Sequence, residues 1–457
     1  MSNTPSSRPA PGAPHTLDVP DFIDRQPLSA YQWLILVLCF LIVAADGFDT
    51  AAIGYIAPSL VKEWGVAKSA LGPVLSAALF GLAVGAITAG PLADKFGRKK
   101  VLLASVFFFG VASLLTATAE TIEVLTALRF LTGLGLGAAM PNAVTLMSEF
   151  APARRRAVIV NTMFCGFPLG ASAGGFLASW LIPHSGWHAV LIAGGVVPLL
   201  LCVALLVLLP ESVRYLVVSG QGADKVRAVL RRIAPQEAAT LAGVTHFTVA
   251  EHKPVSKQSA VGVVLSKPYV VGSTMLWLTY FMGLVIFYLL TSWMPILVKD
   301  AGFTIEQAAL LTALFPLGGG IGTIFSGWLM DKLNPHKVIA VGYALTALLI
   351  YAVGQNTGSV IGLGALIFLA GTAMNGAQSS MPSLAAAFYP TQGRATGVAW
   401  MLGIGRFGGI AGALLGAELM RQKLGFDQIF TLLTLPALVA VVALVVKMRF
   451  TARVSPV

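Results

Sequence analysis

The chain has few charged residues for its length. Only 11% of its 457 residues are Asp, Glu, Lys or Arg, whereas 56% are hydrophobic; a typical soluble domain carries about 25% charged residues. The mean hydropathy is +0.82, and the apolar residues form long continuous runs rather than the short alternating segments of a membrane β-barrel. The scarcity of charge therefore excludes a soluble globular domain and indicates an α-helical integral membrane protein.

Cysteine and recognisable catalytic motifs are also scarce. Cys39, Cys165 and Cys202 each lie in an apolar run, so we interpret them as small buried hydrophobic residues rather than as a disulfide framework. The sequence has no HExxH motif, nucleophile elbow or cluster of metal ligands, so we expect neither an enzyme nor a bound metal or cofactor. The polar first 30 residues lack a short apolar region with a cleavage site, and predict a retained cytoplasmic tail.

Twelve apolar segments are long enough to cross a bilayer, which needs about 20 helical residues. They are expected near residues 30–55, 70–92, 101–119, 122–147, 157–182, 187–209, 270–297, 306–330, 337–354, 358–386, 394–418 and 426–448. We expect two six-helix bundles, at 30–209 and 269–448, joined by a hydrophilic cytoplasmic connector at 210–268 and flanked by cytoplasmic tails at 1–29 and 449–457.

The positive charge is distributed unevenly between the two sides of these spans. A net charge of +11 is compatible with nucleic-acid binding, but Lys and Arg fall in alternate short loops instead of forming one basic surface. Most of them lie in the tails, the connector and the loops on the same side. The opposite side has only Lys62, Lys68, Lys299, Arg421 and Lys423. The positive-inside rule therefore places both termini and the connector in the cytoplasm, and we expect no nucleic-acid partner.

The two halves of the chain resemble each other at a nearly constant offset. A separation of 237 residues relates Gly81 to Gly318, Gly85 to Gly322 and Asp94 to Asp331, and a separation of 238 relates Gly133 to Gly371. An even number of spans in each half makes this a parallel repeat, with a pseudo-twofold axis along the membrane normal. The repeat predicts a binding site between the halves, near the middle of the membrane.

Two aspartates lie inside the first apolar run, which extends from Trp33 to Pro58. Each carboxylate costs roughly 2.5–3.5 kcal/mol at the centre of a spanning helix. Asp46 and Asp49 share one helix face because they are three residues apart. That face is expected to line a polar cavity, a cation site or a proton path, because burial and a neighbouring like charge both favour reversible protonation. The alternative is structural: one acid neutralises a basic partner or caps a helix break at Gly47.

Two arginines also lie within predicted spans. Arg129 is about two turns inside the outer end of span 4, at a depth close to that of the aspartates. It either extends to the membrane interface or forms an ion pair with Asp46 or Asp49 that exchanges as a proton moves. Arg406 is at the centre of span 11, where it could hold a substrate carboxylate bidentately or form a structural pair with Glu418 or with a group on span 7.

Other polar and aromatic side chains within the spans could complete a binding site. The amides could bond either a substrate or neighbouring helices, and the aromatic rings could line the site or pack within the bundle. The candidates for substrate binding, besides Arg406, are Asn142, Gln378, Tyr280, Trp277, Phe164 and Trp400. The second half has no acid at the positions that match the two aspartates, which are Gly283 and Ile286, so proton chemistry is predicted to belong to span 1.

Several segments resemble the signatures of the major facilitator superfamily. GPLADKFGRKK (Gly90–Lys100) resembles its loop between spans 2 and 3, RFLTGLGLGAAMPNA (Arg129–Ala143) its span-4 signature, and PESVRYL (Pro210–Leu216) its motif at the end of span 6. Within the superfamily, DGFDTAAIGYIAPSL in span 1 and FYPTQGRATGVAWMLGIGRFGGI (Phe388–Ile410) are similar to the aromatic acid:proton symporter family.

This resemblance implies a secondary active transporter in the bacterial inner membrane. It implies import of small aromatic carboxylates such as 4-hydroxybenzoate or protocatechuate, coupled to protons and without a cofactor, by a chain that functions as a monomer in the lipid bilayer. It also implicates Asp46 and Asp49 in transport. The alternatives are a symporter for benzoate, gallate or another organic acid, an exporter of aromatic compounds, and a membrane chemoreceptor for aromatic acids.

The loop signature also suggests a conformational latch at the cytoplasmic face. We expect Asp94 to meet the start of span 11 or a neighbouring helix end, and the adjacent basic residues to meet carboxylates such as Glu149. Opening of this latch would belong to alternating access. The residues assigned to the latch are Gly90, Asp94, Gly97, Arg98 and, as the weaker counterpart in the second half, Asp331.

Overall fold

The computed structural model describes residues 16–249 and 260–451. Within these ranges, twelve helical segments are long and apolar enough to cross a membrane, which confirms the predicted all-α class and number of spans. The first six are α2 (Ala30–Trp64), η1 with α3 (Lys68–Leu71 and Gly72–Phe96), α4 (Arg98–Thr116), α5 (Ile122–Phe150), α6 with α7 (Arg156–Phe164 and Gly166–Ser185) and α8 (His188–Leu208).

The remaining six spans follow the connector. They are α13 (Val270–Asp300), α14 (Ile305–Lys332), α15 (Pro335–Gln355), α16 (Val360–Phe388), α17 (Thr391–Arg421) and α18 with α19 (Phe426–Leu432 and Thr434–Thr451). The shorter elements are β1 (Thr16–Asp18), α1 (Val19–Arg25), η2 (Ala153–Arg155), α9 (Val213–Val218), α10 (Ala223–Ile233), η3 (Pro235–Glu237), α11 (Ala238–Ala242), β2 (His246–Thr248) and α12 (Ala260–Val264).

Helix α2, which holds both aspartates, is longer than the predicted 30–55. It begins with a capping box between Ser29 and Gln32 and continues through Pro58 to Gly65, whose φ of 64° ends the helix in the left-handed region. The helix is continuous through Gly47, between the two aspartates. The interpretation that an acid caps a helix break at Gly47 is therefore wrong.

Matched glycines bring the same helices together in each half. A β-carbon on Gly81 or Gly85 of α3 would lie 2.1 or 2.2 Å from a backbone oxygen of α5. The repeat-related Gly318 and Gly322 of α14 would meet backbone oxygens of α16 at 2.1 and 2.0 Å. Only glycine permits such backbone contact, so the constant offset in the sequence corresponds to the same helix packing in both halves.

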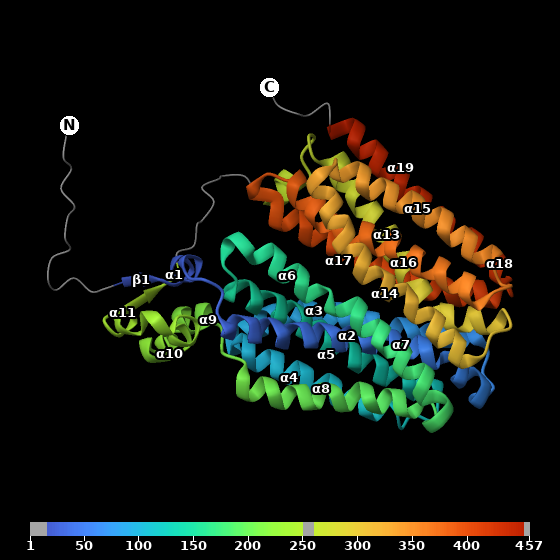
Figure 1. Cartoon of the computed structure of the whole chain (residues 1–457), viewed down its shortest axis with the longest axis horizontal. Coiled ribbons are helices and arrows are strands. Elements are labelled where there is room, and N and C mark those ends of the chain that lie inside the picture. Colours follow the sequence, from blue (N-terminus) through green and yellow to red (C-terminus); the bar gives the residue numbers. More distant parts are fainter. Residues whose placement is uncertain (1–15, 250–259, 452–457) are drawn as a thin grey trace.

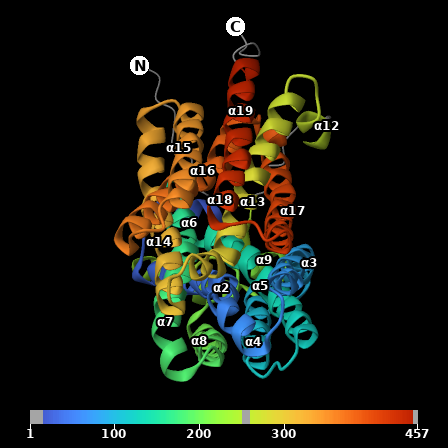
Figure 2. The same cartoon turned by 90° about the vertical axis from the view of Figure 1, so that its right-hand side faces the viewer.

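The two halves converge at one end of the molecule and diverge at the other. Helices α2–α8 and α13–α19 meet near α7 and α14 and separate toward the end that carries α10 (Figure 1); the view turned by 90° shows one bundle above the other (Figure 2). One hydrophobic core, which includes Tyr55, Leu60, Trp293 and Phe315, joins both halves. Toward the termini, each half has a core of its own. The structure is thus closed at the end far from the termini.

The connector and the N-terminal segment form a small unit beside the first half. Strand β1 pairs in parallel with β2, and Val226 and Leu230 of the amphipathic helix α10 share a core with Phe22 of α1. The backbone N–H of Ala153, after α5, donates to Asp24 Oδ1 at 2.6 Å. These contacts attach the unit to the end of the first bundle.

Candidate functional site

Arg129 and Asp49 form a fully buried ion pair in the first half. Both side chains are only 1% exposed, and Arg129 Nη1 lies 2.9 Å from Asp49 Oδ2 and 3.0 Å from Oδ1. Nη2 also donates to the backbone carbonyl of Asp49 at 3.2 Å, and Ser113 of α4 donates to Oδ1 at 3.4 Å. Arg129 does not extend to the membrane interface; its charge is neutralised where three helices meet.

Asp46 lies one turn earlier on α2 and has a different environment. Its Oδ1 accepts a hydrogen bond from Thr50 at 3.3 Å, whereas its buried Oδ2 has no hydrogen-bond partner among the described residues. The side chain is within electrostatic range of Asp49 and of Arg406 from the opposite half. Burying a carboxylate with one unsatisfied oxygen and no cation in contact among the described residues is costly, so Asp46 is the acid that gains most from a proton or a bound cation.

Arg406 reaches from α17 toward the first half. Its Nη1 donates to the backbone carbonyl of Leu82 on α3 at 3.1 Å, and its side chain is partly buried. Glu418 instead pairs with Arg421, at 2.7 Å, so the expectation of a structural pair with Glu418 is wrong. Among the described residues, this bond to a neutral carbonyl uses one of the five guanidinium N–H groups, so most donors of Arg406 face no other hydrogen-bond acceptor there and could bind an anion.

The two candidate amides bond to protein groups in this conformation. Asn142 donates to the carbonyl of Ala138 in its own helix at 2.9 Å. Gln378 of α16 donates to the carbonyl of Tyr280 on α13 at 3.3 Å and accepts a hydrogen bond from the hydroxyl of Tyr343 on α15. Gln378 therefore connects three helices of the second half and fixes the backbone next to Tyr280.

The candidate aromatic residues have three different surroundings. Tyr280 packs over Gly405, next to Arg406, and is within electrostatic range of that arginine. The rings of Trp277 and Trp400 lie together, with centroids 5.7 Å apart. Phe164 is at the end of α6 and is 37% exposed. Tyr280 is thus placed beside Arg406.

The latch residues lie at the end of the first bundle near the termini. Arg98 Nε lies 2.8 Å from Glu149 Oε1, as expected for the basic residues, and Ser212 donates to the other oxygen of Glu149. Asp94 is 74% exposed and lies 3.6 Å from Arg98 at the start of α4, a neighbouring helix end, rather than against α17.

Two glycines of the latch differ in their surroundings. Gly97 has φ of 99°, and a β-carbon there would lie 2.4 Å from Glu211 Oε2. Glu211 accepts a hydrogen bond from the backbone N–H of Lys99 at 3.0 Å. A β-carbon on Gly90 would meet open space. The side chain of Asp331 lies outside the described residues.

Some neighbours of these charges were not assigned from the sequence. Thr50, Ser113 and Leu82 each lie next to one of them, as does Ser212 beside Glu149. Tyr288 of α13 is within electrostatic range of both Asp46 and Arg406. The sequence indicated a place for Tyr288 near the site, because it lies in an aromatic-rich span close to Ile286, the repeat-related position of Asp49. The contact of Arg406 with the backbone oxygen of Leu82 has no signature in the sequence.

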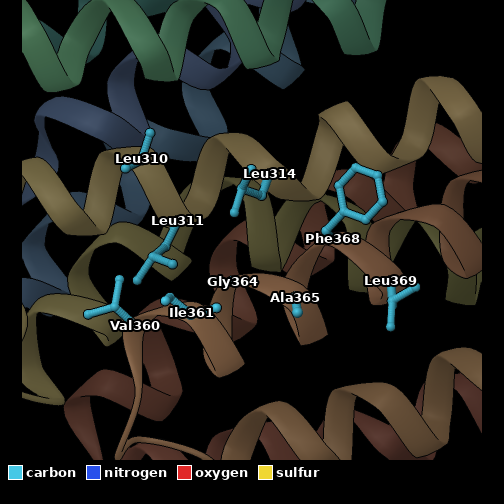
Figure 3. A pocket seen from close by; sticks show the side chains of 9 residues that line it. All are labelled: Leu310, Leu311, Leu314, Val360, Ile361, Gly364, Ala365, Phe368 and Leu369. Atoms are coloured by element: carbon cyan, nitrogen blue, oxygen red, sulfur yellow. The ribbon is translucent and has the colours of Figure 1, made fainter.

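An apolar depression lies on the outside of the second bundle, away from these charged groups. It has a volume of about 580 Å³ and lies between α14 and α16 (Figure 3). Leu310, Leu314, Phe368 and Leu369 line it together with other apolar residues, and Ile361 is 85% exposed. It offers no charged or hydrogen-bonding side chain and is unsuited to a carboxylate. Among the described residues, no group of three or more His, Cys, Asp or Glu side chains could hold a metal ion.

Comparisons with known proteins give a consistent result. The family model described as "Major Facilitator Superfamily" matches residues 39–310 and 294–456. The chain is 55% identical to the 4-hydroxybenzoate transporter PcaK of Pseudomonas putida over 94% of this chain and 96% of that protein. It is 48% identical to the gallate transporter of Pseudomonas putida, over 96% and 97%.

Among solved structures, the fold is similar to the xylose transporter XylE of E. coli in a partially occluded inward-open conformation. The TM-score is 0.70 at 20% identity, covering 92% of this chain and 98% of that one. This likeness concerns the fold alone.

Proposed function

Because the chain belongs to the major facilitator superfamily, we propose that this transporter imports 4-hydroxybenzoate and related aromatic carboxylates together with protons. The charge arrangement between the halves carries the proposal. Buried Asp46, whose Oδ2 has no hydrogen-bond partner among the described residues, lies within electrostatic range of the guanidinium of Arg406 and beside the ion pair of Asp49 and Arg129. The names of the similar transporters support an aromatic carboxylate as the substrate.

In this proposal, the two buried acids have separate roles. Asp49 serves as the counter-ion of Arg129: two hydrogen bonds from Arg129 reach its Oδ1 and its backbone carbonyl, Nη1 also lies 2.9 Å from Oδ2, and Ser113 donates to Oδ1. Asp46 receives the transported proton. Two acids one helical turn apart can thus differ in function because only one of them has a cation of its own.

The coupling follows from a charge balance at Arg406. In the empty site, ionised Asp46 offsets the charge of Arg406. When Asp46 takes a proton, Arg406 is left without an opposing charge and binds the substrate carboxylate. The loaded and the empty site then carry the same net charge, so each form can lie between the halves as they rock. Binding of substrate to an unprotonated site would leave an excess negative charge, which is costly in a buried environment.

The membrane potential gives a reason for coupling. Moving one negative charge inward against 100 mV costs about 2.3 kcal/mol. One proton carried with the carboxylate removes this cost, and a second proton would add the potential as driving force.

We further propose that the structure is inward-facing, in the bacterial inner membrane, with the termini and connector in the cytoplasm. The shared core closes the opposite, outer end, where Lys68 of the first half and Asp300 of the second form an ion pair at 2.5 Å. Lys62 is also within electrostatic range of Glu306 across the halves.

The test is uptake of radiolabelled 4-hydroxybenzoate by proteoliposomes that contain the purified protein. We expect accumulation when the outside is made acidic, loss of accumulation when a protonophore removes the gradient, and competition by other ring-substituted benzoates. Empty liposomes under the same gradient control for passive entry of the neutral acid. Uptake that ignores the gradient, or net transport only outward, would overturn the proposal and favour a facilitator or an exporter.

A further inference from the structure

Two tyrosine rings from α13 pack directly over glycines of α17, on either side of Arg406. A β-carbon on Gly405 would lie 2.2 Å from the ring of Tyr280, and one on Gly409 would lie 2.6 Å from Cδ2 and 2.9 Å from Cε2 of Tyr288. Carbon atoms do not approach this closely in folded proteins, so a larger residue at either glycine must displace the ring. The glycines therefore determine how far each ring stands from α17.

Tyr288 lies close to Arg406, the proposed anchor of the substrate carboxylate. Gly409 is three residues after Arg406 and so lies about one turn along the same helix. Tyr288 is partly buried and within electrostatic range of both Arg406 and Asp46. The unsatisfied Oδ2 of the 2%-exposed Asp46 independently indicates a ligand or proton at this place.

We propose that Tyr288 and Gly409 form the wall that sets the width of the aromatic site and thereby selects carboxylates by the number of their ring substituents. This inference rests on the proposed function. With glycine at 409, the Tyr288 ring packs back against α17 and leaves room for hydroxyl groups on the substrate ring. A side chain at 409 would push the Tyr288 ring into that room.

The variants Gly409→Ala and Tyr288→Ala test the wall from opposite directions. We measure the ratio of kcat/KM for 3,4,5-trihydroxybenzoate to that for 4-hydroxybenzoate in proteoliposomes. Gly409→Ala is expected to lower this ratio roughly tenfold, since one methylene of misfit in a pocket is worth about 10- to 200-fold. Tyr288→Ala is expected to raise the ratio. The double variant Tyr288→Ala with Gly409→Ala is expected to have a higher ratio than Gly409→Ala alone. Tyr288→Phe keeps the ring and is expected to leave the ratio within about twofold of the native protein.

The same helix pair supplies a matched control. Gly416 of α17 lies under Trp293 of α13, where a β-carbon would be 2.2 Å from Cδ1 of the indole. Trp293 is buried in the core shared by the halves, and its Nε1 donates to the carbonyl of Ala413 at 2.9 Å. Gly416→Ala is therefore expected to lower the thermal midpoint and the overall rate without changing the substrate ratio.

Three outcomes would overturn the inference: an unchanged ratio in folded Gly409→Ala, an unchanged ratio in Tyr288→Ala, or an equal shift in Gly416→Ala. If Gly409→Ala does not fold, the substrate ratio of Tyr288→Ala tests the inference by itself, because this variant removes side-chain atoms and so creates no steric clash. Failure of the proposed function can be told apart from failure of this inference. If the proposed function is wrong, the native protein accumulates neither 4-hydroxybenzoate nor 3,4,5-trihydroxybenzoate in response to a proton gradient.

Discussion

Removing the carboxylate of Asp49 is expected to destabilise the protein strongly. Asp49→Ala leaves the guanidinium of Arg129 inside the bundle without its counter-ion, because both side chains are 1% exposed. Loss of one partner of a buried ion pair costs about 3–5 kcal/mol. The loss includes contacts from Nη1 to both carboxylate oxygens, at 3.0 and 2.9 Å. The bond from Nη2 to the backbone carbonyl of Asp49, at 3.2 Å, remains possible, so we expect the lower part of that range.

The measurement is the thermal midpoint and the monodisperse yield of the detergent-purified protein. Asp49→Ala combined with Arg129→Leu is expected to recover most of the loss, because replacing a buried ion pair with apolar residues is often near neutral. Asp46→Asn is the matched control one turn away on the same helix. This variant replaces a carboxylate that accepts one hydrogen bond, from Thr50 at 3.3 Å. The free energy of unfolding should therefore change by about 1 kcal/mol or less.

Native-like stability of Asp49→Ala would show that Arg129 finds another counter-charge or water and that the ion pair is not required for stability. A double variant as unstable as Asp49→Ala would also count against a stabilising role of this pair. In that case the loss would come from packing around α2, α4 and α5 and not from an unpaired charge.

Two further predictions concern the outer closure and the substrate anchor. Lys68→Asp places two acids together where Lys68 and Asp300 now pair at 2.5 Å. In a chain that also carries Ala417→Cys, where Ala417 packs against Gly72, this change should increase alkylation of the new thiol by a reagent added outside. Adding Asp300→Lys should reverse the increase. An unaltered labelling rate would show that the ion pair does not hold the outer end closed. Arg406→Lys keeps the charge but loses the bidentate geometry, so it should raise the KM for 4-hydroxybenzoate about 10- to 100-fold, corresponding to roughly 1.4–2.8 kcal/mol; an unchanged KM would exclude Arg406 as the anchor.

Features that depend on local sequence were predictable. The twelve spans follow from apolar runs, and the glycine pairs that bring α3 to α5 and α14 to α16 were visible as matched positions of the repeat. The cost of buried charge indicated that Asp46, Asp49 and Arg129 must find partners within the protein. The sequence left open which aspartate pairs with Arg129, because the two lie on one face of α2, and the choice depends on the position of α2 along α5 to within one helical turn.

Features that depend on how the halves meet were not predictable. Arg406 bonds to a backbone carbonyl 324 residues away, and any residue at position 82 would present the same oxygen. Tyr288 appears in the sequence as one aromatic residue among many, and its place beside Asp46 and Arg406 depends on the packing of α13 against both α2 and α17. The N-terminal residues 16–25 looked like part of a tail, yet they pack with the connector because β1 finds its partner more than 200 residues later, in β2.

In the proposed mechanism, Asp46 receives the transported proton. The most direct test of this role compares two modes of transport by Asp46→Asn in proteoliposomes. Counterflow, the exchange of labelled outside substrate for unlabelled inside substrate, requires no net proton movement and is expected to continue at a rate that no longer depends on pH. Accumulation driven by an imposed proton gradient is expected to disappear. Accumulation by Asp46→Asn that still follows the proton gradient as in the native protein would show that another group receives the proton.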